Sequence, residues 1–176
     1  MLSGEPAPDD GLSGRAGRTR EAELLRRAMT RLSSGVAVVA AHWQGRLHAM
    51  TATALCSVSL DPPLVLTCVG RASRFHAAIL GSGTWGISLL AADQQPLARH
   101  FADRGRDLLT QFDTVAHRLG DRTGAPLLEG GLAWLECETS AVHDGGDHSI
   151  VVGRVLDAGL GRRDLTPLTY YQGSYE

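Results

Sequence analysis

The stretch from Gly35 to Thr53 has the sequence GVAVVAAHWQGRLHAMTAT, and it decides the fold class. Its first nine residues form a β-branched and apolar run, which is typical of a strand. Gln44-Gly45 is a turn signal, and the residues from Arg46 to Thr53 suit a returning strand. The stretch therefore predicts a β-hairpin near the start of the folded chain.

Strand-like segments outnumber helical ones on either side of this hairpin. The sequence predicts further strands at residues 64–69, 84–90, 132–142 and 149–156. Helices are expected at residues 19–32, 73–80 and 93–103, with Ser73 as the N-cap of the second. Residues 54–61 are expected to form a connection, and residues 104–130 an irregular segment. Turn signals recur at short intervals, so the pattern favours a mainly β fold, a β-barrel with peripheral helices, over a βαβ sheet.

The size and charge of the chain narrow its class. It has 176 residues and a formal net charge of -2 at pH 7, which fits one domain and argues against a nucleic-acid binder. Residues 1–18 are rich in Gly, Pro, Ser and Asp, so we expect a disordered tail before a domain at residues 19–176. No apolar run approaches the ~20 residues of a membrane span, and the tail lacks the apolar stretch of a signal peptide. We therefore expect a cytoplasmic protein.

The basic and sulfur-containing residues exclude some chemistries. All 17 basic residues are arginine, so neither a Schiff-base lysine nor a P-loop lysine is available. Cys56, Cys68 and Cys137 lie far apart without a Cys-x-x-Cys pair, and we expect them to be reduced, buried thiols. The sequence has no Gly-x-Ser-x-Gly motif, which argues against a serine hydrolase.

Two motifs look like ligand sites but have simpler interpretations. Residues 81–86, GSGTWG, match Gly-x-Gly-x-x-Gly, yet an expected helix precedes them and a strand follows, the reverse of a dinucleotide fold. We interpret these glycines as the end of the helix. Residues 143–148, HDGGDH, could supply metal ligands, but a tight turn points adjacent side chains apart. We expect a polar hairpin with one functional histidine there, and no metal.

Three residues near position 72 suggest an anion site. Arg71, Ser73 and Arg74 surround the expected start of a helix, where N–H groups and the helix dipole favour a phosphate. The guanidinium group of arginine can also donate two hydrogen bonds at once to phosphate oxygens. The hydroxyl-rich segment 51–59, TATALCSVS, leads into the strand before this helix, so the two segments together would suit a mononucleotide. A solvated, arginine-rich loop is the alternative interpretation.

Three blocks of sequence resemble the short-chain NAD(P)H:flavin oxidoreductases, which are reductase components of two-component flavin monooxygenases. The blocks are Met50–Leu64 (MTATALCSVSLDPPL), Ser73-Arg74-Phe75 with the helix that follows, and Gly146–Val155 (GDHSIVVGRV). The resemblance spans residues 24–176 and implies an FMN-binding split β-barrel, with FAD as the other candidate flavin. It also implies a homodimer with the flavin near the subunit interface, NADH or NADPH as second substrate, and a monooxygenase that receives reduced flavin.

The resemblance also assigns roles to individual residues. His148 matches the family's Gly-Asp-His histidine, which lies near the nicotinamide and the flavin, and it is the expected catalytic residue. Six residues would line the flavin ring and ribityl chain, and three would hold the phosphate: Thr51, Ala52, Thr53, Ser57, Val58 and Ser59, then Arg71, Ser73 and Arg74. Thr53 and Ser88 stand where family members often carry Asn, which leaves the choice between FMN and FAD open.

The mechanism that the resemblance implies is hydride transfer from nicotinamide C4 to flavin N5, with the protein supplying alignment and electrostatics. Backbone N–H groups of residues 51–59 would stabilise negative charge on the flavin. His148 would orient the nicotinamide or relay a proton, unless it is only a turn residue hydrogen-bonded to Asp147. Two other functions stay open: a flavoprotein that acts on its own organic substrate, and a non-catalytic flavin-binding module.

Overall fold

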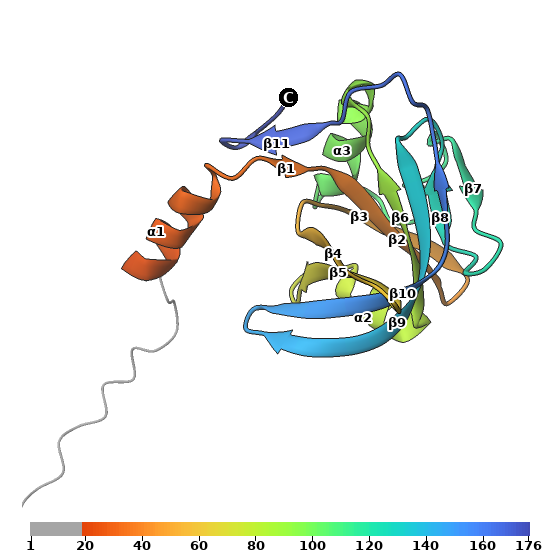
Figure 1. Ribbon diagram of the computed structural model, residues 1–176, viewed down its shortest axis with the longest axis horizontal. Coiled ribbons are helices and arrows are strands. Elements are labelled where there is room, and N and C mark those ends of the chain that lie inside the picture. Colours follow the sequence, from red (N-terminus) through yellow and green to blue (C-terminus); the bar gives the residue numbers. More distant parts are fainter. Residues whose placement is uncertain (1–18) are drawn as a thin grey trace, which may run out of the picture.

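A seven-stranded antiparallel sheet forms the centre of the protein. The computed structural model describes residues 19–176 (Figure 1). The strand order is β3-β2-β6-β9-β10-β5-β4, and each neighbouring pair is antiparallel. These strands are β2 (Ala37–Trp43), β3 (Arg46–Ala52), β4 (Leu55–Leu60), β5 (Pro63–Gly70), β6 (Thr84–Leu89), β9 (Ala133–Gly145) and β10 (His148–Leu160).

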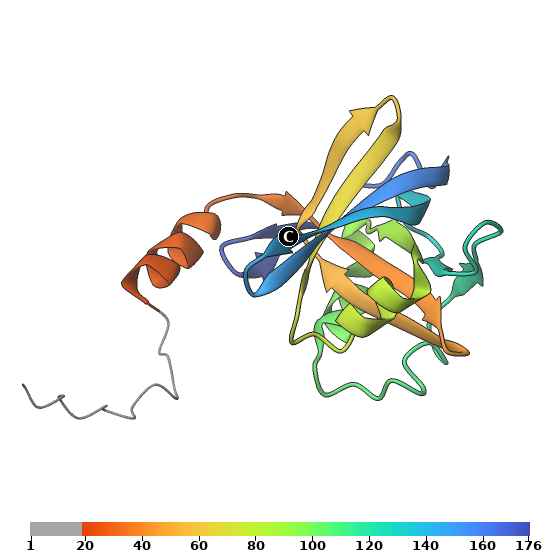
Figure 2. The same cartoon turned by 90° about the horizontal axis from the view of Figure 1, so that it is seen from below.

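The sheet curls into a split barrel. Strands β3 and β4 are its two edges and do not pair with each other within residues 19–176. Two register shifts in the β9–β10 pair, next to Gly153 and Val155, bend these long strands. Figure 2 shows the β4–β5 and β2–β3 hairpins splayed to opposite sides of that pair. The mainly β, split-barrel fold expected from the sequence is confirmed.

Smaller elements surround the sheet. The remaining strands form a three-stranded sheet and a two-stranded one: β1 (Ser34–Gly35) with β11 (Thr169–Tyr171) and β12 (Ser174–Tyr175), and β7 (His117–Leu119) with β8 (Pro126–Leu128). The helices are α1 (Arg20–Met29), α2 (His76–Ser82) and α3 (Gln95–Ala102), and the 3₁₀ helix η1 (Ala92–Gln94) precedes α3. Helices α2 and α3 lie against the barrel, so each covers part of the core (Figure 1).

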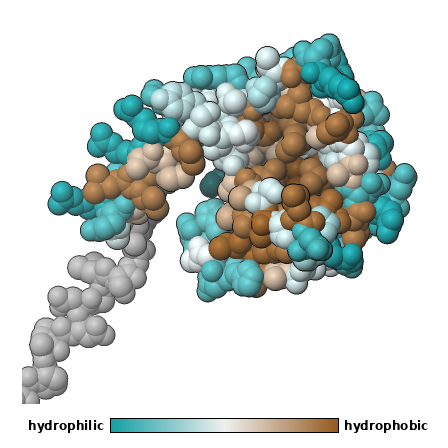
Figure 3. Space-filling view, viewed as in Figure 1, coloured by the Kyte–Doolittle hydropathy of each residue, from teal (hydrophilic) through white to brown (hydrophobic). Residues whose placement is uncertain are grey.

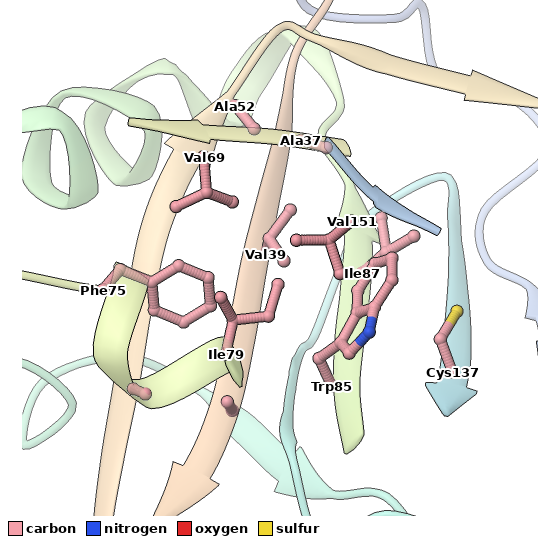
Figure 4. Packing of buried hydrophobic residues seen from close by; sticks show 12 residues of the cluster. Ala37, Val39, Ala52, Val69, Phe75, Ile79, Trp85, Ile87, Cys137 and Val151 are labelled. Carbon is pink, nitrogen blue, oxygen red and sulfur yellow. The ribbon is translucent and has the colours of Figure 1, made fainter. Parts of the chain in front are cut away.

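Strand β2 is buried on both faces, which explains its unbroken apolar run. Val39 packs with Trp85 and Ile79 in one core cluster, which α2 covers (Figure 4). Val38, on the opposite face, packs with Phe101 of α3 in a second cluster. The predicted hairpin is confirmed, because β2 and β3 pair as far as the turn at Gln44-Gly45.

Several expected boundaries are wrong. The connection expected at residues 54–61 is strand β4, whose side chains are mostly exposed and therefore show no alternation of apolar residues. The irregular segment expected at residues 104–130 contains the short β7–β8 hairpin. The second helix begins at His76, because Ser73 lies in a turn, where its Oγ accepts a hydrogen bond from the Phe75 N–H.

Other expectations have mixed outcomes. Gly83 ends α2 with a left-handed φ of 68°, which confirms the helix-end interpretation of residues 81–86. All three cysteines are free thiols, but Cys137 alone among them is buried: Cys68 is half-buried, and Cys56 is exposed because it lies on the edge strand β4. The tail expected at residues 1–18 lies outside the described residues.

Helix α1 extends away from the barrel (Figure 1). It has no buried residue, and its apolar Leu24, Leu25 and Met29 are 53%, 63% and 52% exposed. Figure 3 shows apolar side chains gathered both on α1 and on the face of the barrel beside it. No helix among the described residues is both long and apolar enough to cross a membrane.

Candidate functional site

A pocket of about 500 Å³ lies where four segments of the chain meet, and we name it the His148 pocket. The segments are the ends of β3 and β5, the end of α3 with the loop that follows, and the β9–β10 turn. The pairing of β10 with β5 places His148 opposite Gly70. The lining residues are Met50, Thr51, Gly70, Ala72, Ser73, Arg74, Phe75, Phe101, Ala102, Arg104, Arg106, Asp147 and His148.

The imidazole of His148 is held by its two neighbours in the pocket. Its Nδ1 donates to Asp147 Oδ1 at 2.7 Å, and this hydrogen bond holds the pKa of the Asp147 carboxyl below its usual range. A Cβ built at Gly70 would lie 3.5 Å from His148 Nε2, so the ring rests against the glycine. With Nδ1 committed to Asp147, Nε2 is the nitrogen left for a ligand.

Arg71 fixes the turn that carries His148. Its Nε donates to the Gly146 carbonyl at 3.0 Å, and its Nη2 donates to Asp144 Oδ1 at 3.1 Å. The Gly146 N–H donates to the same carboxylate at 2.8 Å, and this bond, followed by Arg71, lowers the pKa of Asp144. Arg71 therefore acts on the β9–β10 turn and is not among the residues that line the pocket.

Ser73 and Arg74 belong to a turn between β5 and α2. The Ser73 N–H donates to the Gly70 carbonyl at 2.9 Å, which folds the chain back toward the sheet. Arg74 Nη1 donates to the Arg106 carbonyl at 3.0 Å, so this turn is tied to the loop after α3. The pocket wall therefore carries a hydroxyl and a guanidinium from one short turn.

A larger groove of about 940 Å³ lies between α1 and the barrel, and we name it the α1 groove. Residues of α1, β1, the β3–β4 connection and the C-terminal segment line it, among them Met29, Thr53, Cys56 and Tyr170. Its lining is mostly apolar.

The family model of the flavin reductase like domain matches residues 29–176. The chain belongs to this family. A NADH-dependent flavin reductase of Rhodococcus sp is 43% identical over 154 residues, which cover 86% of this chain and 83% of the relative. A NADH-dependent FAD reductase of Streptomyces globisporus is 44% identical over 135 residues, or 76% of this chain and 74% of that one.

Solved structures of flavin reductases share the fold. BorF, the flavin reductase component of a bacterial two-component tryptophan halogenase, has a TM-score of 0.81 and 46% identity, covering 88% of this chain and 96% of BorF. SgcE6, an NADH:FAD oxidoreductase of Streptomyces globisporus solved with NAD and FAD fragments, has a TM-score of 0.83 and 37% identity, covering 93% and 96%. The resemblance found in the three sequence blocks is thus confirmed.

The structure of this flavin reductase family member gathers part of the expected site. Thr51, Ser73, Arg74 and His148 line one pocket. The other expected residues lie elsewhere: Ala52 is buried, Thr53 lines the α1 groove, Ser57, Val58 and Ser59 are on β4 outside both cavities, and Arg71 is bound to the β9–β10 turn.

Arg104 and Arg106 are pocket residues that the sequence analysis missed. Both lie in the loop after α3, which is rich in Arg, Asp and Gly and has the composition of an ordinary surface loop. The feature of the sequence that could have pointed to them is their position just after Phe101, at the end of an amphipathic helix. Only the packing of α3 against β3 brings them to the pocket.

The HDGGDH segment forms the end of the β9–β10 hairpin. Its carboxylates bind Arg71 and His148, and within residues 19–176 no group of three or more His, Cys, Asp or Glu side chains could hold a metal ion. The segment therefore acts as a turn that carries one pocket histidine.

Proposed function

We propose that this protein is an NAD(P)H-dependent flavin reductase that reduces FMN or FAD and supplies reduced flavin to a separate monooxygenase. The observation that carries the proposal is the His148 pocket, in which Thr51, Ser73, Arg74 and His148 meet. The relatives named above support it, because their names describe NADH-dependent reductases of flavin. BorF, a component of a two-component halogenase, supports an oxygenase-type partner.

The pocket suits a flavin nucleotide. Its volume of about 500 Å³ falls in the range of small-molecule sites, roughly 300–1,000 Å³. Met50, Phe75 and Phe101 offer apolar surface, whereas Ser73 and Arg74 offer donors that suit phosphate oxygens. We propose Thr51, Ser73 and Arg74 as flavin-binding residues, with Arg71 supporting them by holding the β9–β10 turn.

Strand β4 fits a second contact with the flavin. It is an edge strand that pairs only with β5 among the described strands, so N–H groups on its outer side are available to a ligand. The register shift between Ser57 and Ser59 turns part of the edge away from β5. We propose that Ser57, Val58 and Ser59 approach the flavin through this edge, where N–H groups would offset negative charge on the ring. Ala52 at the end of β3 and Thr53 in the connection to β4 are proposed to adjoin the flavin beside them.

His148 is the proposed catalytic residue. A bound flavin supplies the chemistry of accepting a hydride at N5 from the nicotinamide. The Asp147 carboxylate accepts a hydrogen bond from Nδ1–H of His148, so Nε2 is the ring nitrogen left to meet a ligand. His148 would then orient the nicotinamide ring or move a proton at Nε2.

We further propose that the protein is a cytoplasmic homodimer. The apolar residues of α1 and the α1 groove are uncovered in the single chain, and Thr53 lies in that groove. A second copy would cover both surfaces and bring its own atoms close to the flavin-binding segment 51–59.

The test is the loss of absorbance at 340 nm when purified protein, NADH or NADPH, and FMN or FAD are mixed in air. We expect rapid loss that depends on added flavin. Absence of nicotinamide oxidation with either flavin, despite flavin binding seen by fluorescence quenching, would contradict the reductase proposal. That outcome would direct attention to an organic substrate or to a binding function.

A further inference from the structure

Three guanidinium groups line the His148 pocket. Arg74 comes from the turn before α2, whereas Arg104 and Arg106 come from the loop after α3. The hydrogen bond from Arg74 Nη1 to the Arg106 carbonyl joins the two segments at 3.0 Å. The three positive charges therefore belong to one cluster, not to separate surface positions.

No acidic side chain neutralises this cluster in an ion pair, within residues 19–176. The ion pairs of the protein involve other arginines, and Asp147, the acid that lines the pocket, is bound to His148. Asp103 lies near Arg106 without an ion pair to it, and its Oδ1 accepts from the Gly105 N–H at 2.8 Å, so two carboxylates, those of Asp103 and Asp147, stand against three guanidinium groups. The pocket thus has an excess of positive charge, which an anion would balance.

Arg106 is held rigidly in the pocket wall. Its Nε donates to Gln111 Oε1 at 3.0 Å, and its Nη1 donates to the carbonyls of Phe101 and Asp103 at 2.9 and 2.7 Å. Its Nη2 donates to the Ala49 carbonyl. Burial and then the nearby Arg74 lower its pKa, so the charge sits where water solvates it poorly. These bonds fix the loop that carries Arg104, an exposed side chain without a described hydrogen bond.

We propose that Arg104 and Arg106, together with Arg74, form a phosphate subsite that makes the protein prefer phosphorylated flavins to riboflavin. Arg104 contacts the phosphate, and Arg106 positions the loop and adds a fixed charge. The proposal rests on the proposed flavin reductase function. The chemistry follows from the guanidinium group, which binds phosphate oxygens with two parallel N–H bonds.

The same phosphate chemistry has two possible sources, the flavin nucleotide and the nicotinamide dinucleotide. The flavin phosphate is favoured, because Ser73 and Arg74 in the proposed flavin-binding turn adjoin the loop directly. If the phosphate belongs to the dinucleotide instead, the subsite affects the KM for NADH even when riboflavin is the acceptor.

The test compares the variants Arg104→Ala and Arg106→Lys with the control Arg163→Ala, an exposed arginine outside both cavities. Fluorescence quenching measures the Kd of each for riboflavin, FMN and FAD. We expect FMN and FAD to bind about tenfold more weakly to Arg104→Ala, the factor that one charged hydrogen bond is worth. Arg106→Lys keeps a positive charge but loses the bonds that fix the loop, so its FMN and FAD binding should fall between that of Arg104→Ala and that of the unaltered protein. Riboflavin binding and the control should change less than about twofold.

Two results would overturn the subsite: an equal loss for riboflavin and FMN, which indicates a general structural defect, or no change in any flavin Kd or in the KM for NADH. A higher KM for NADH with riboflavin as acceptor, at unchanged flavin Kd, assigns the phosphate to the dinucleotide. The Kd measurements with riboflavin, FMN and FAD need no turnover, so they test the phosphate subsite even if the protein shows no reductase activity. Arg104→Ala removes an exposed side chain, so it stays informative if Arg106→Lys does not fold.

Discussion

His148 owes its position to three other residues. Asp147 binds Nδ1, Gly70 leaves space beside the ring, and Arg71 holds the turn through the Gly146 carbonyl. The side chain is 47% exposed, so it is placed by these contacts without being enclosed. An imidazole with a fixed tautomer and an accessible Nε2 is suited to orienting a ligand or moving a proton.

Replacing His148 should impair turnover more than flavin binding. We expect His148→Ala to lower kcat/KM for NADH about a hundredfold, the lower range for a positioned acid or base, with flavin Kd unchanged. Steady-state kinetics at 340 nm measure the effect. His143→Ala is the matched control, since His143 is exposed on the same hairpin and does not line the pocket. Unaltered kinetics in His148→Ala would remove the residue from the mechanism.

Glu136 is a buried carboxylate bound by a turn. Its Oε2 accepts from the N–H groups of Arg122 and Thr123 and from Thr123 Oγ1, at 2.7–3.0 Å. Glu136→Ala leaves these donors without a partner, so we expect a loss of about 3 kcal/mol of unfolding free energy. Glu138→Ala, two residues along β9 in a half-exposed pair with Arg154, should lose less than about 1 kcal/mol. Urea denaturation measures the unfolding free energy of both variants. Equal losses would contradict the conclusion that the bonds of Glu136 to the turn stabilise the fold.

Burial raises the pKa of the Cys137 thiol to about 12, from an ordinary value of 9.0. Between these two values the unfolded chain releases a proton that the folded chain keeps. Folding stability should therefore fall as pH rises above 9, at about 1.4 kcal/mol per pH unit from this group. Urea unfolding from pH 8 to pH 10.5, roughly spanning this window, measures the slope. In Cys137→Ala the loss of stability per pH unit should be smaller by that amount. An unchanged loss per pH unit would show that Cys137 does not contribute.

At the scale of elements, the bend in β10 depends on a glycine. A Cβ at Gly153 would overlap the indole of Trp85 and lie 3.0 Å from the Cβ of Cys137. We expect Gly153→Ala to cost about 1–3 kcal/mol, because neither the buried indole nor the strand can move freely. Gly35→Ala is the control, since nothing lies within 4 Å of its Cβ position. Thermal or urea denaturation of both variants tests the difference, and equal stability would show that the strands adjust.

The elements that the sequence predicted well are those with a buried face. Strand β2 carries an unbroken apolar run because α2 and α3 cover its two faces, and the Gln44-Gly45 turn marks its end. Strand β4 could not be predicted in this way, because it is an exposed edge strand whose partner is β5 alone. The start of α2 was misplaced because Ser73 bonds within a turn, as helix-capping residues also do.

Only part of the His148 pocket could be predicted, because some of its residues come from recognisable sequence blocks and others are brought in by packing. Thr51, Ser73, Arg74 and His148 follow recognisable sequence blocks, and the resemblance placed them in one site. Arg104 and Arg106 follow no such block, and their role comes from the packing of α3 on β3. Conversely, Arg71 has the right side chain for a phosphate, but Asp144 and Gly146 already occupy its guanidinium.

At the scale of the whole molecule, helix α1 stands out because none of its residues is buried and its apolar side chains are exposed. We expect light scattering to give twice the 18.7 kDa of a single chain. Leu25→Asp places a charge on the exposed apolar face of α1 and should shift the protein toward the monomer. Arg27→Ala, on the same helix, should leave the dimer intact. A monomer in the unaltered protein would refute the proposed pairing.

The His148 pocket is made from residues 50–51, 70, 72–75, 101–102, 104, 106 and 147–148, which only the completed sheet brings together. A partly folded chain therefore has no place to bind a flavin, so the ligand stabilises the native state alone. At a free flavin concentration of about 100 times Kd, this adds about 2.7 kcal/mol to the free energy of unfolding. Supply of the vitamin from which flavins are made would then set how much of the protein survives proteolysis, as well as how fast it works.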